Sequence, residues 1–205
     1  MKYPIEQRCG FHGIETRTSL AINKKNNIAE AIWRQLAAEL HEVKYGDRIA
    51  VYTDGSVKDK KAACAVWSKN FKLVSRLRNG SSSYTAELNA IYYAISFIKT
   101  LPENFVIYSD SLSALTTLSC VSSSTNQIAH KIYEVVLKLP ANKIIIEWVP
   151  SHTGILGNEN ADKLANQALS MIAIQEDSGT AADIIREIPL GRWVLVIFQE
   201  NSKLQ

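Results

Sequence analysis

The spacing of hydrophobic positions divides the chain into a helical lead-in, a run of alternating strands and helices, and a weakly patterned end. Ile28, Ile32 and Leu36 repeat at helical spacing, which predicts a helix over 28–42. From Arg48 the pattern changes to a period of two, as in a β-strand, and the turn dipeptide Asp54-Gly55 predicts where this strand stops. The next predicted elements are strands over 63–68 and 71–77, a helix over 85–100, a strand over 104–110, helices over 111–120 and 127–139, a strand over 143–149 and a helix over 159–170.

The order of these elements predicts one α/β domain over 47–170. Three strands, a helix, a strand, two helices, a strand and a final helix follow one another. A strand-helix-strand unit favours parallel pairing with a right-handed crossover, so we expect a mixed sheet with helices on both faces. Residues 1–46 are interpreted as an N-terminal extension with one helix, and 171–205 as a C-terminal extension in which 192–198 is a candidate strand.

Composition narrows the class of protein. The 205 residues are 46% hydrophobic and 21% charged, which excludes collagen-like, disordered and coiled-coil classes. The three cysteines lie far apart, so neither a disulfide framework nor a thiolate zinc site is indicated. Apolar runs are shorter than the roughly 20 residues of a membrane helix, and the N-terminus lacks the apolar stretch of a signal peptide. We therefore expect an intracellular protein without a membrane, in nucleus or cytoplasm.

Four acidic residues are expected to converge on one edge of the sheet. Asp54 and Asp110 follow apolar strand runs, and ligands of α/β sheets bind where such strands end. Glu87 and Asp162 fall on the apolar faces of their helices, so both are expected to point at the sheet. Singly, each acid is explained by turn or helix-end preferences. Together they favour a bound hard cation such as Mg²⁺ or Mn²⁺, because crowded carboxylates repel one another.

Four sequence blocks resemble those of the ribonuclease H type 1 family, in the family's order and over about 47–170. Within the family, the RNase H domains attached to reverse transcriptases in non-LTR retrotransposon polyproteins look most similar, and they have a comparable lead-in helix. The blocks are YTDGS (52–56), TAELNAI (85–91), YSDS (108–111) and WVPSHTGILGNENADKLA (148–165).

The resemblance implies a five-stranded mixed sheet and a nuclease site. It implies that Asp54, Glu87, Asp110 and Asp162 hold two Mg²⁺ ions, with Mn²⁺ as a substitute, and that Asp54 bridges them. It also implies hydrolysis of the RNA strand of an RNA–DNA hybrid, leaving a 5′-phosphate and a 3′-hydroxyl. The matching loop histidine, His152, would move protons or help the product leave, roles that suit its neutral-range titration.

The resemblance further implies contacts with the nucleic acid, and each contact has an ordinary alternative. Gly55 and Ser56 would bring the backbone of the chain close to a ribose or phosphate. Thr85 and Ser111 resemble family positions that touch the hybrid, but both residue types also cap helices. Asn89 belongs to the same set, with simple exposure to solvent as its alternative.

The distribution of charge favours a polyanionic partner more clearly than the net charge of +3 does. The segment 47–170 has 13 Lys and Arg against 10 Asp and Glu, and four of these acids belong to the predicted site. With those four neutralised by cations, the rest of the domain is distinctly basic, as expected for binding to phosphates. However, the lysine-rich handle of many cellular RNases H has no counterpart, because VSSSTN (121–126) stands in its place.

Three functions therefore remain open from the sequence. The first is a Mg²⁺-dependent hybrid ribonuclease, with a reverse transcriptase domain as a candidate partner in a parent polyprotein. The second is an inactive or weakly active retroelement-derived module that binds nucleic acid. The third is a related nuclease that cuts DNA, which the TAEL and SHTGILGNENAD blocks disfavour. The sequence does not indicate an oligomeric state.

Overall fold

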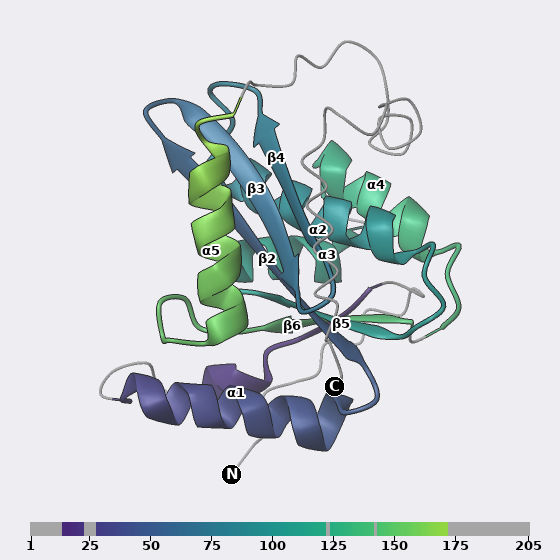
Figure 1. Cartoon of the computed structure of the whole chain (residues 1–205). Helices are drawn as coiled ribbons and strands as arrows, with labels where there is room; N and C mark the ends of the chain where they lie inside the picture. Colours follow the sequence, from purple (N-terminus) through teal and green to yellow (C-terminus); the bar gives the residue numbers. More distant parts are fainter. Residues whose placement is uncertain (1–13, 23–27, 122–123, 142, 172–205) are drawn as a thin grey trace, which may run out of the picture.

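The computed structural model describes residues 14–22, 28–121, 124–141 and 143–171 as an α/β fold built on one mixed sheet (Figure 1). Its strands are β1 (Glu15–Arg17), β2 (Ile49–Lys58), β3 (Lys61–Ser68), β4 (Lys72–Leu77), β5 (Phe105–Ser109) and β6 (Ile144–Trp148). Its helices are α1 (Glu30–Tyr45), α2 (Ser83–Ile98), α3 (Leu112–Ser119), α4 (Gln127–Val136) and α5 (Leu156–Ala168), with a 3₁₀ turn at Ser19–Ile22. None of the helices in these ranges has the length and apolar character needed to cross a membrane.

The pairing of the strands confirms the mixed α/β sheet expected from the sequence. The order across the sheet is β1-β6-β5-β2-β3-β4. β2, β3 and β4 pair antiparallel, whereas β5 lies parallel to both β2 and β6. The five expected strands are joined by a sixth, β1, which pairs parallel with β6. β1 has only three residues, too few for a period of two to be recognised. The candidate strand over 192–198 lies outside the described residues.

β2 continues past the position where the sequence predicts its end. The dipeptide Asp54-Gly55 is typical of a turn, but β2 runs on to Lys58. Pairing with β5 stops one residue before Asp54, whereas pairing with β3 continues to the last residue of β2. The turn falls at Asp59 and Lys60, whose φ angles of 50° and 62° suit a tight hairpin. The antiparallel partner therefore overrides the local turn preference.

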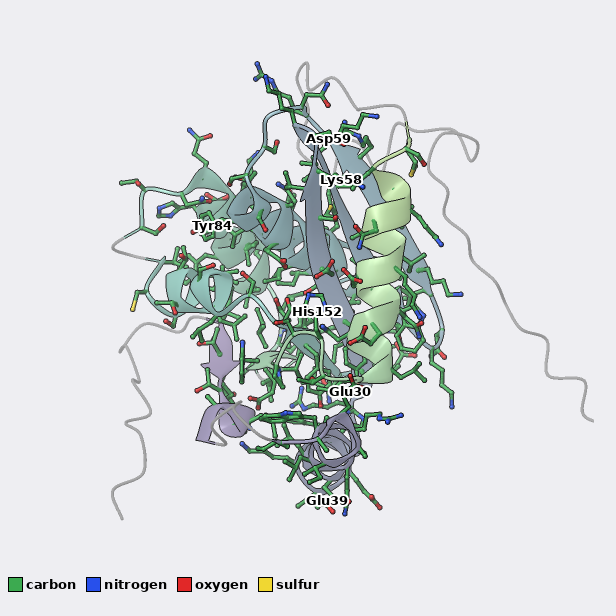
Figure 2. The ribbon with its side chains drawn as sticks, turned by 90° about the vertical axis from the view of Figure 1, so that its left-hand side faces the viewer. Glu30, Glu39, Lys58, Asp59, Tyr84 and His152 are labelled. Atoms are coloured by element: carbon green, nitrogen blue, oxygen red, sulfur yellow. The ribbon has the colours of Figure 1, made fainter. Side chains whose placement is uncertain are left out.

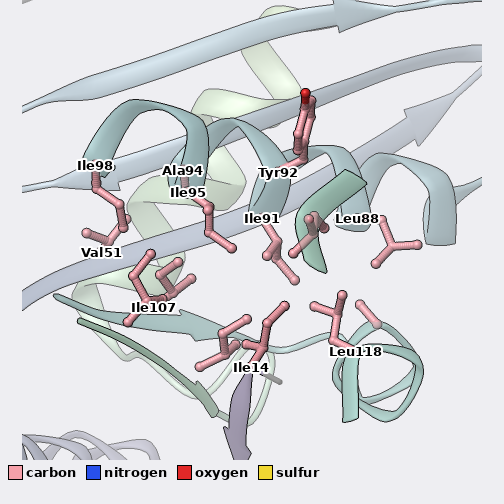
Figure 3. Close-up of a cluster of buried hydrophobic side chains, with 14 of the residues drawn as sticks. Ile14, Val51, Leu88, Ile91, Tyr92, Ala94, Ile95, Ile98, Ile107 and Leu118 are labelled. Carbon is pink, nitrogen blue, oxygen red and sulfur yellow. The ribbon is translucent and has the colours of Figure 1, made fainter. Parts of the chain in front are cut away.

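Helices cover both faces of the sheet, with α2, α3 and α4 on one face and α1 and α5 on the other (Figure 1). The main core lies beneath α2, whose Ile91 and Ile95 share a fully buried cluster with Val51 of β2 and Ile107 of β5 (Figure 3). Successive residues of a strand point to opposite faces, so Tyr52 and Asp110, unlike these core residues, belong to the side of α1 and α5. The predicted site acids of β2 and β5 thus lie outside the apolar core.

α1 packs against the second face of the sheet, which explains part of the apolar stripe over 28–42, although Ile32 is 50% exposed. Trp33 and Tyr45 of α1 are buried in one cluster with Val106 and Tyr108 of β5. The lead-in helix is therefore joined to the sheet by a hydrophobic core of its own.

α5 begins at Leu156, whereas the sequence predicts a loop through Asn158. Glycine disfavours helices, so Gly157 favours the loop interpretation. In the structure, a Cβ atom at Gly157 would lie 2.2 Å from Cε2 of Tyr52. The glycine is required because the first turn of α5 lies directly on this tyrosine ring.

A buried carboxylate on β6 joins the N-terminal segment 14–45 to the sheet. The side chain of Glu147 is fully buried and accepts three hydrogen bonds. Its Oε1 accepts from the backbone N–H of Ser19 at 2.7 Å, and its Oε2 accepts from Ser19 Oγ at 2.8 Å and Tyr45 Oη at 2.6 Å. Because a buried charge is costly without such partners, this segment is held by polar as well as apolar contacts.

We expect the substitution Tyr45→Phe to lower the free energy of unfolding by about 1.5–3 kcal/mol, because Glu147 loses a charge-assisted hydrogen bond. Urea unfolding followed by circular dichroism measures the loss. The matched control is Tyr133→Phe, which removes the same atom from a half-buried tyrosine of α4. Equal stability of the two variants would contradict the role given to this hydrogen bond.

Candidate active site

One cavity of about 500 Å³ holds all five residues that the sequence predicts to be catalytic. It opens between the middle of β2, the residues after β5, the first half of α2, the start of α3, the loop before α5 and α5 itself. Two lining residues, Tyr84 and His152, are labelled in Figure 2. The lining residues are Asp54, Gly55, Ser83, Tyr84, Glu87, Asp110, Ser111, Leu112, Ser113, Ser151, His152 and Asp162.

Three of the predicted acids form a tight cluster. Asp54 on β2, Glu87 on α2 and Asp110 directly after β5 each offer a carboxylate oxygen, and these oxygens lie within 4.8 Å of one another. The parallel register pairs Thr53 with Ser109, so the residues that follow them emerge side by side. The meeting of Asp54 and Asp110 is therefore a direct result of strand register.

Gly55 lets α2 approach β2 closely enough for Glu87 to join the cluster. A Cβ atom at Gly55 would lie 2.5 Å from the backbone nitrogen of Glu87 and 2.7 Å from the carbonyl carbon of Ala86. No side chain fits in that space. The backbone of Gly55 also hydrogen-bonds to the carboxylates of Asp54 and Glu87, which partly offsets the rise that burial causes in the pKa of both. Gly55 thus has a structural role, besides its predicted contact with a ribose.

Burial and mutual repulsion favour the protonated forms of these acids when no cation is bound. Burial, followed by the charges of Asp54 and Asp110, raises the pKa of Glu87 to about 9. Burial, followed by the charges of Asp110 and Asp162, raises the pKa of Asp54 to about 7. Burial also raises the pKa of Asp110. At neutral pH the cluster therefore resists full ionisation unless positive charge is supplied.

The fourth predicted acid, Asp162, lines the same cavity but lies outside the cluster of three. It is half-buried on α5, and its charge adds to the rise that burial causes in the pKa of Asp54 and Asp110. Its Oδ1 accepts a hydrogen bond of 2.9 Å from Nδ2 of Asn166, one turn later on the same helix. Asp162 therefore lies at the edge of the cavity, beside the cluster of the other three acids.

His152 lies at the exposed side of the cavity, on the loop between β6 and α5. Its φ angle of 53° is left-handed, which is uncommon for a residue other than glycine. Its charge partly offsets the rise that burial causes in the pKa of Asp110. The position agrees with a histidine that meets both solvent and the acidic cluster.

The predicted nucleic-acid contacts occupy two kinds of position. Ser111 lines the cavity, and its Oγ also caps α3 by accepting from the backbone N–H of Ala114. Ser56, Thr85 and Asn89 have hydrogen bonds within the chain, to Asn166, Ser82 and the Thr85 carbonyl respectively. The N-cap of α2 is Ser82, so Thr85 is not the capping residue. Their contacts with a hybrid stay predictions.

Asn158 is a site residue that the sequence pattern alone does not single out. Its side chain is 3% exposed, and Nδ2 donates a hydrogen bond of 3.1 Å to Oδ2 of Asp110. This bond fixes the orientation of the carboxylate and partly offsets the rise that burial causes in the pKa of Asp110. The available signal is its place in GNENAD, one helical turn before Asp162, where both side chains share a helix face.

The cluster fits a divalent metal ion. Its donors are oxygens only, which suits hard cations such as Mg²⁺. Oε2 of Glu87 is buried and has no hydrogen-bond partner among the described residues. A buried carboxylate oxygen without a partner is costly, and a cation would supply the missing interaction.

We expect the protein in EDTA to lose stability as the pH rises from about 5 to about 9. The folded-state pKa values of Asp54 and Glu87, about 7 and 9, exceed the ordinary values of 3.8 and 4.5. The folded state therefore binds more protons than the unfolded state in this range, so the free energy of unfolding falls with pH. Thermal unfolding measured across the range tests the slope.

Glu87→Gln should remove most of this slope and stabilise the metal-free protein at pH 7 by roughly 1–2 kcal/mol, the equivalent of about one pKa unit. The control is Glu103→Gln, because Glu103 is exposed and does not line the cavity. A metal-free protein whose melting temperature is flat from pH 5 to 9 would show that these acids do not repel one another.

Comparison with known proteins shows which family the chain belongs to. The family model described as RNase H matches residues 46–170. Human "Ribonuclease H1" is 29% identical over 143 residues, which cover 60% of this chain and 50% of the human protein. The chain thus spans about half the length of this curated relative. Because the family model matches well over half of its residues, the chain belongs to the RNase H family.

Proposed function

We propose that this chain hydrolyses the RNA strand of RNA–DNA hybrids and leaves 5′-phosphate and 3′-hydroxyl ends. The observation that carries the proposal is the cluster of Asp54, Glu87 and Asp110 in a chain of the RNase H family, with one buried oxygen of Glu87 that has no hydrogen-bond partner in the described part of the chain. The name of the human relative supports the same activity.

The four acids of the cavity would hold two Mg²⁺ ions, with Asp54 shared between them as the family resemblance implies. When bound, the two ions would activate the attacking water and stabilise the leaving oxygen of the phosphodiester. Asn158 keeps Oδ2 of Asp110 in one orientation by its hydrogen bond. His152, at the solvent side, can give a proton to the departing oxygen or take one from water.

Recognition of RNA would depend on the 2′-hydroxyl groups of the scissile strand. A hybrid has an A-like form whose wide minor groove displays these groups. Gly55 and Ser111 line the cavity, so their backbone or side-chain groups can meet a ribose there. The surplus of basic residues in 47–170 would bind the phosphates without reading their sequence.

One observation favours the alternative of a weakly active binding module. α3 ends at Ser119 and α4 begins at Gln127, and the VSSSTN connection between them has no lysine or arginine. A hybrid would lose the phosphate contacts that a basic handle supplies elsewhere in the family. A turnover assay with a labelled hybrid, in excess over the protein, separates an enzyme from a module that binds without cutting.

Asp54→Asn should abolish cleavage, with less than about a tenth of wild-type activity left, because the amide keeps the shape but removes the charge that attracts the ions. Circular dichroism should show an unchanged fold. The control is Asp59→Asn in the exposed hairpin turn, whose left-handed backbone asparagine tolerates. Substantial activity in Asp54→Asn would contradict the central role of this acid.

We expect the protein to cleave a strand only if that strand is RNA. We expect cleavage of the RNA strand in a hybrid of about 20 base pairs and no comparable cleavage of a DNA duplex of the same sequence, because the DNA lacks the 2′-hydroxyls. Reaction products resolved on a denaturing gel, with either strand labelled in turn, give the answer. Comparable cutting of the DNA duplex would favour the related DNA nuclease instead.

His152→Asn should slow turnover by roughly 10²-fold without abolishing it, because proton transfer by a side chain contributes about 10²–10⁴-fold while the ions remain. Asparagine is chosen because it tolerates the left-handed backbone of this position. Steady-state kinetics at saturating Mg²⁺ measures the effect. A loss as complete as that of Asp54→Asn in a folded protein would make the histidine an essential base.

A further inference from the structure

We propose that Ser56 and Asn166 are positioning residues that hold the carboxylate of Asp162 ready for a metal ion; the proposal rests on the proposed function. Ser56 Oγ on β2 donates a hydrogen bond of 2.8 Å to Oδ1 of Asn166 on α5. Nδ2 of Asn166 then donates to Oδ1 of Asp162 at 2.9 Å and to its carbonyl at 3.0 Å. The three side chains form one continuous chain of hydrogen bonds from the sheet to the acid.

The direction of this chain is set by Asp162, and Ser56 supports it from the other end. An asparagine amide has one oxygen that accepts and one nitrogen that donates, and a flip exchanges them. The carboxylate and the carbonyl of Asp162 can only accept, so they select the amide nitrogen of Asn166. The flipped amide would place its oxygen against the carboxylate, which is unfavourable. The hydroxyl of Ser56 donates to the amide oxygen on the other side and so holds the amide in this orientation.

The fold places the three residues together for two separate reasons. Ser56 stands two residues after Asp54 on β2, so both side chains leave the same face of the strand. α5 packs along β2 and β3 on that face (Figure 1). Asn166 follows Asp162 by four residues, so the two side chains are neighbours on the helix surface. The register of one strand against one helix therefore aligns donor, amide and carboxylate.

Asp162 needs such support more than the other acids do. Asp54 and Glu87 are each 7% exposed and fixed by their surroundings, whereas Asp162 is half-buried at the rim and outside the cluster of three. A half-exposed side chain loses rotamer freedom when it binds an ion, and that loss opposes binding. Holding Oδ1 in place beforehand reduces the loss and leaves Oδ2 for the metal. Groups that orient metal ligands in this way typically change metal affinity about 10–100-fold.

This role differs measurably from the contact with nucleic acid that the sequence predicts for Ser56. A positioning residue should change the dependence on Mg²⁺ and leave the KM for the hybrid unchanged once Mg²⁺ is saturating. A residue that touches the hybrid should raise that KM at every Mg²⁺ concentration. The two roles therefore separate in a titration of the metal.

The test compares the full-length wild type with Ser56→Ala, Ser56→Thr, Asn166→Ala and Asp162→Asn. Gln167→Ala is the matched control, because Gln167 is an exposed neighbour on α5 outside the hydrogen-bonded chain. The first readout is the melting temperature as a function of Mg²⁺ concentration without substrate, which reports binding of the ion to the folded protein. The second is kcat and KM for a hybrid at limiting and saturating Mg²⁺.

We expect the half-saturating Mg²⁺ concentration to rise about tenfold for Asn166→Ala. For Ser56→Ala we expect a rise on the order of threefold, because Asn166 keeps its bond to Asp162 but loses the group that orients its amide. Ser56→Thr keeps the hydroxyl and should restore the wild-type value, and Gln167→Ala should match wild type. If the positioning role is right, KM for Ser56→Ala, Ser56→Thr and Asn166→Ala at saturating Mg²⁺ should stay within about twofold of wild type, because the loss acts through the metal site and not through the hybrid.

Three results would count against the proposal, and they are distinguishable. If Mg²⁺ stabilises wild type and Asp162→Asn weakens that effect while Asn166→Ala does not, the positioning role is wrong and the metal site stands. If Mg²⁺ does not stabilise wild type at all, the metal site of the proposed function is wrong, and the positioning role fails with it. A raised KM for Ser56→Ala at saturating Mg²⁺ would show that Ser56 contacts the hybrid instead of positioning Asp162.

Discussion

The structure depends on the parallel pairing of β2 with β5. Their register sets Thr53 opposite Ser109, so Asp54 and Asp110 emerge together on the face away from the main apolar core. A slip of one residue would turn one of these carboxylates to the opposite face. The remaining parts of the site are placed relative to this pair. α2 brings Glu87 to it, and the packing of α5 across β2 brings the amide and the carboxylate that this helix contributes.

The crowded carboxylates that form the site also lower the stability of the fold around them. Three carboxylates within 4.8 Å destabilise one another wherever their charges are not balanced. The chain balances them only in part, with the amide of Asn158 and the backbone of Gly55. An oxygen of Glu87 is left buried without a partner among the described residues. The site therefore lacks positive charge near its carboxylates, and a bound cation would supply it. The stability of the fold and the binding of the metal depend on the same carboxylate oxygens.

The sequence predicts the α/β class, the five main strands and the four acids of the cavity because each has a local signal. Apolar runs mark β5 and β6, and the polar residue after an apolar run marks Asp110. Other features depend on contacts between distant segments, which leave no local pattern. β2 passes through Asp54-Gly55 because β3 pairs with it, and Gly157 belongs to a helix because it lies on Tyr52. Asn158 is not predicted from the sequence, because its amide meets Asp110 only in the folded chain.

The hydrogen bonds of Glu147 show that the folding unit begins before residue 46. The family match starts at residue 46, yet all three donors to this buried carboxylate belong to Ser19 and Tyr45. A fragment cut at the family boundary would keep the anion on β6 and lose every one of these partners. The same cut would remove Trp33 and Tyr45 from the apolar cluster that covers Val106 and Tyr108, and it would take β1 from the edge of β6. Exposing that apolar surface and that strand edge to water costs free energy. The unit that folds is therefore longer than the unit that the family shares.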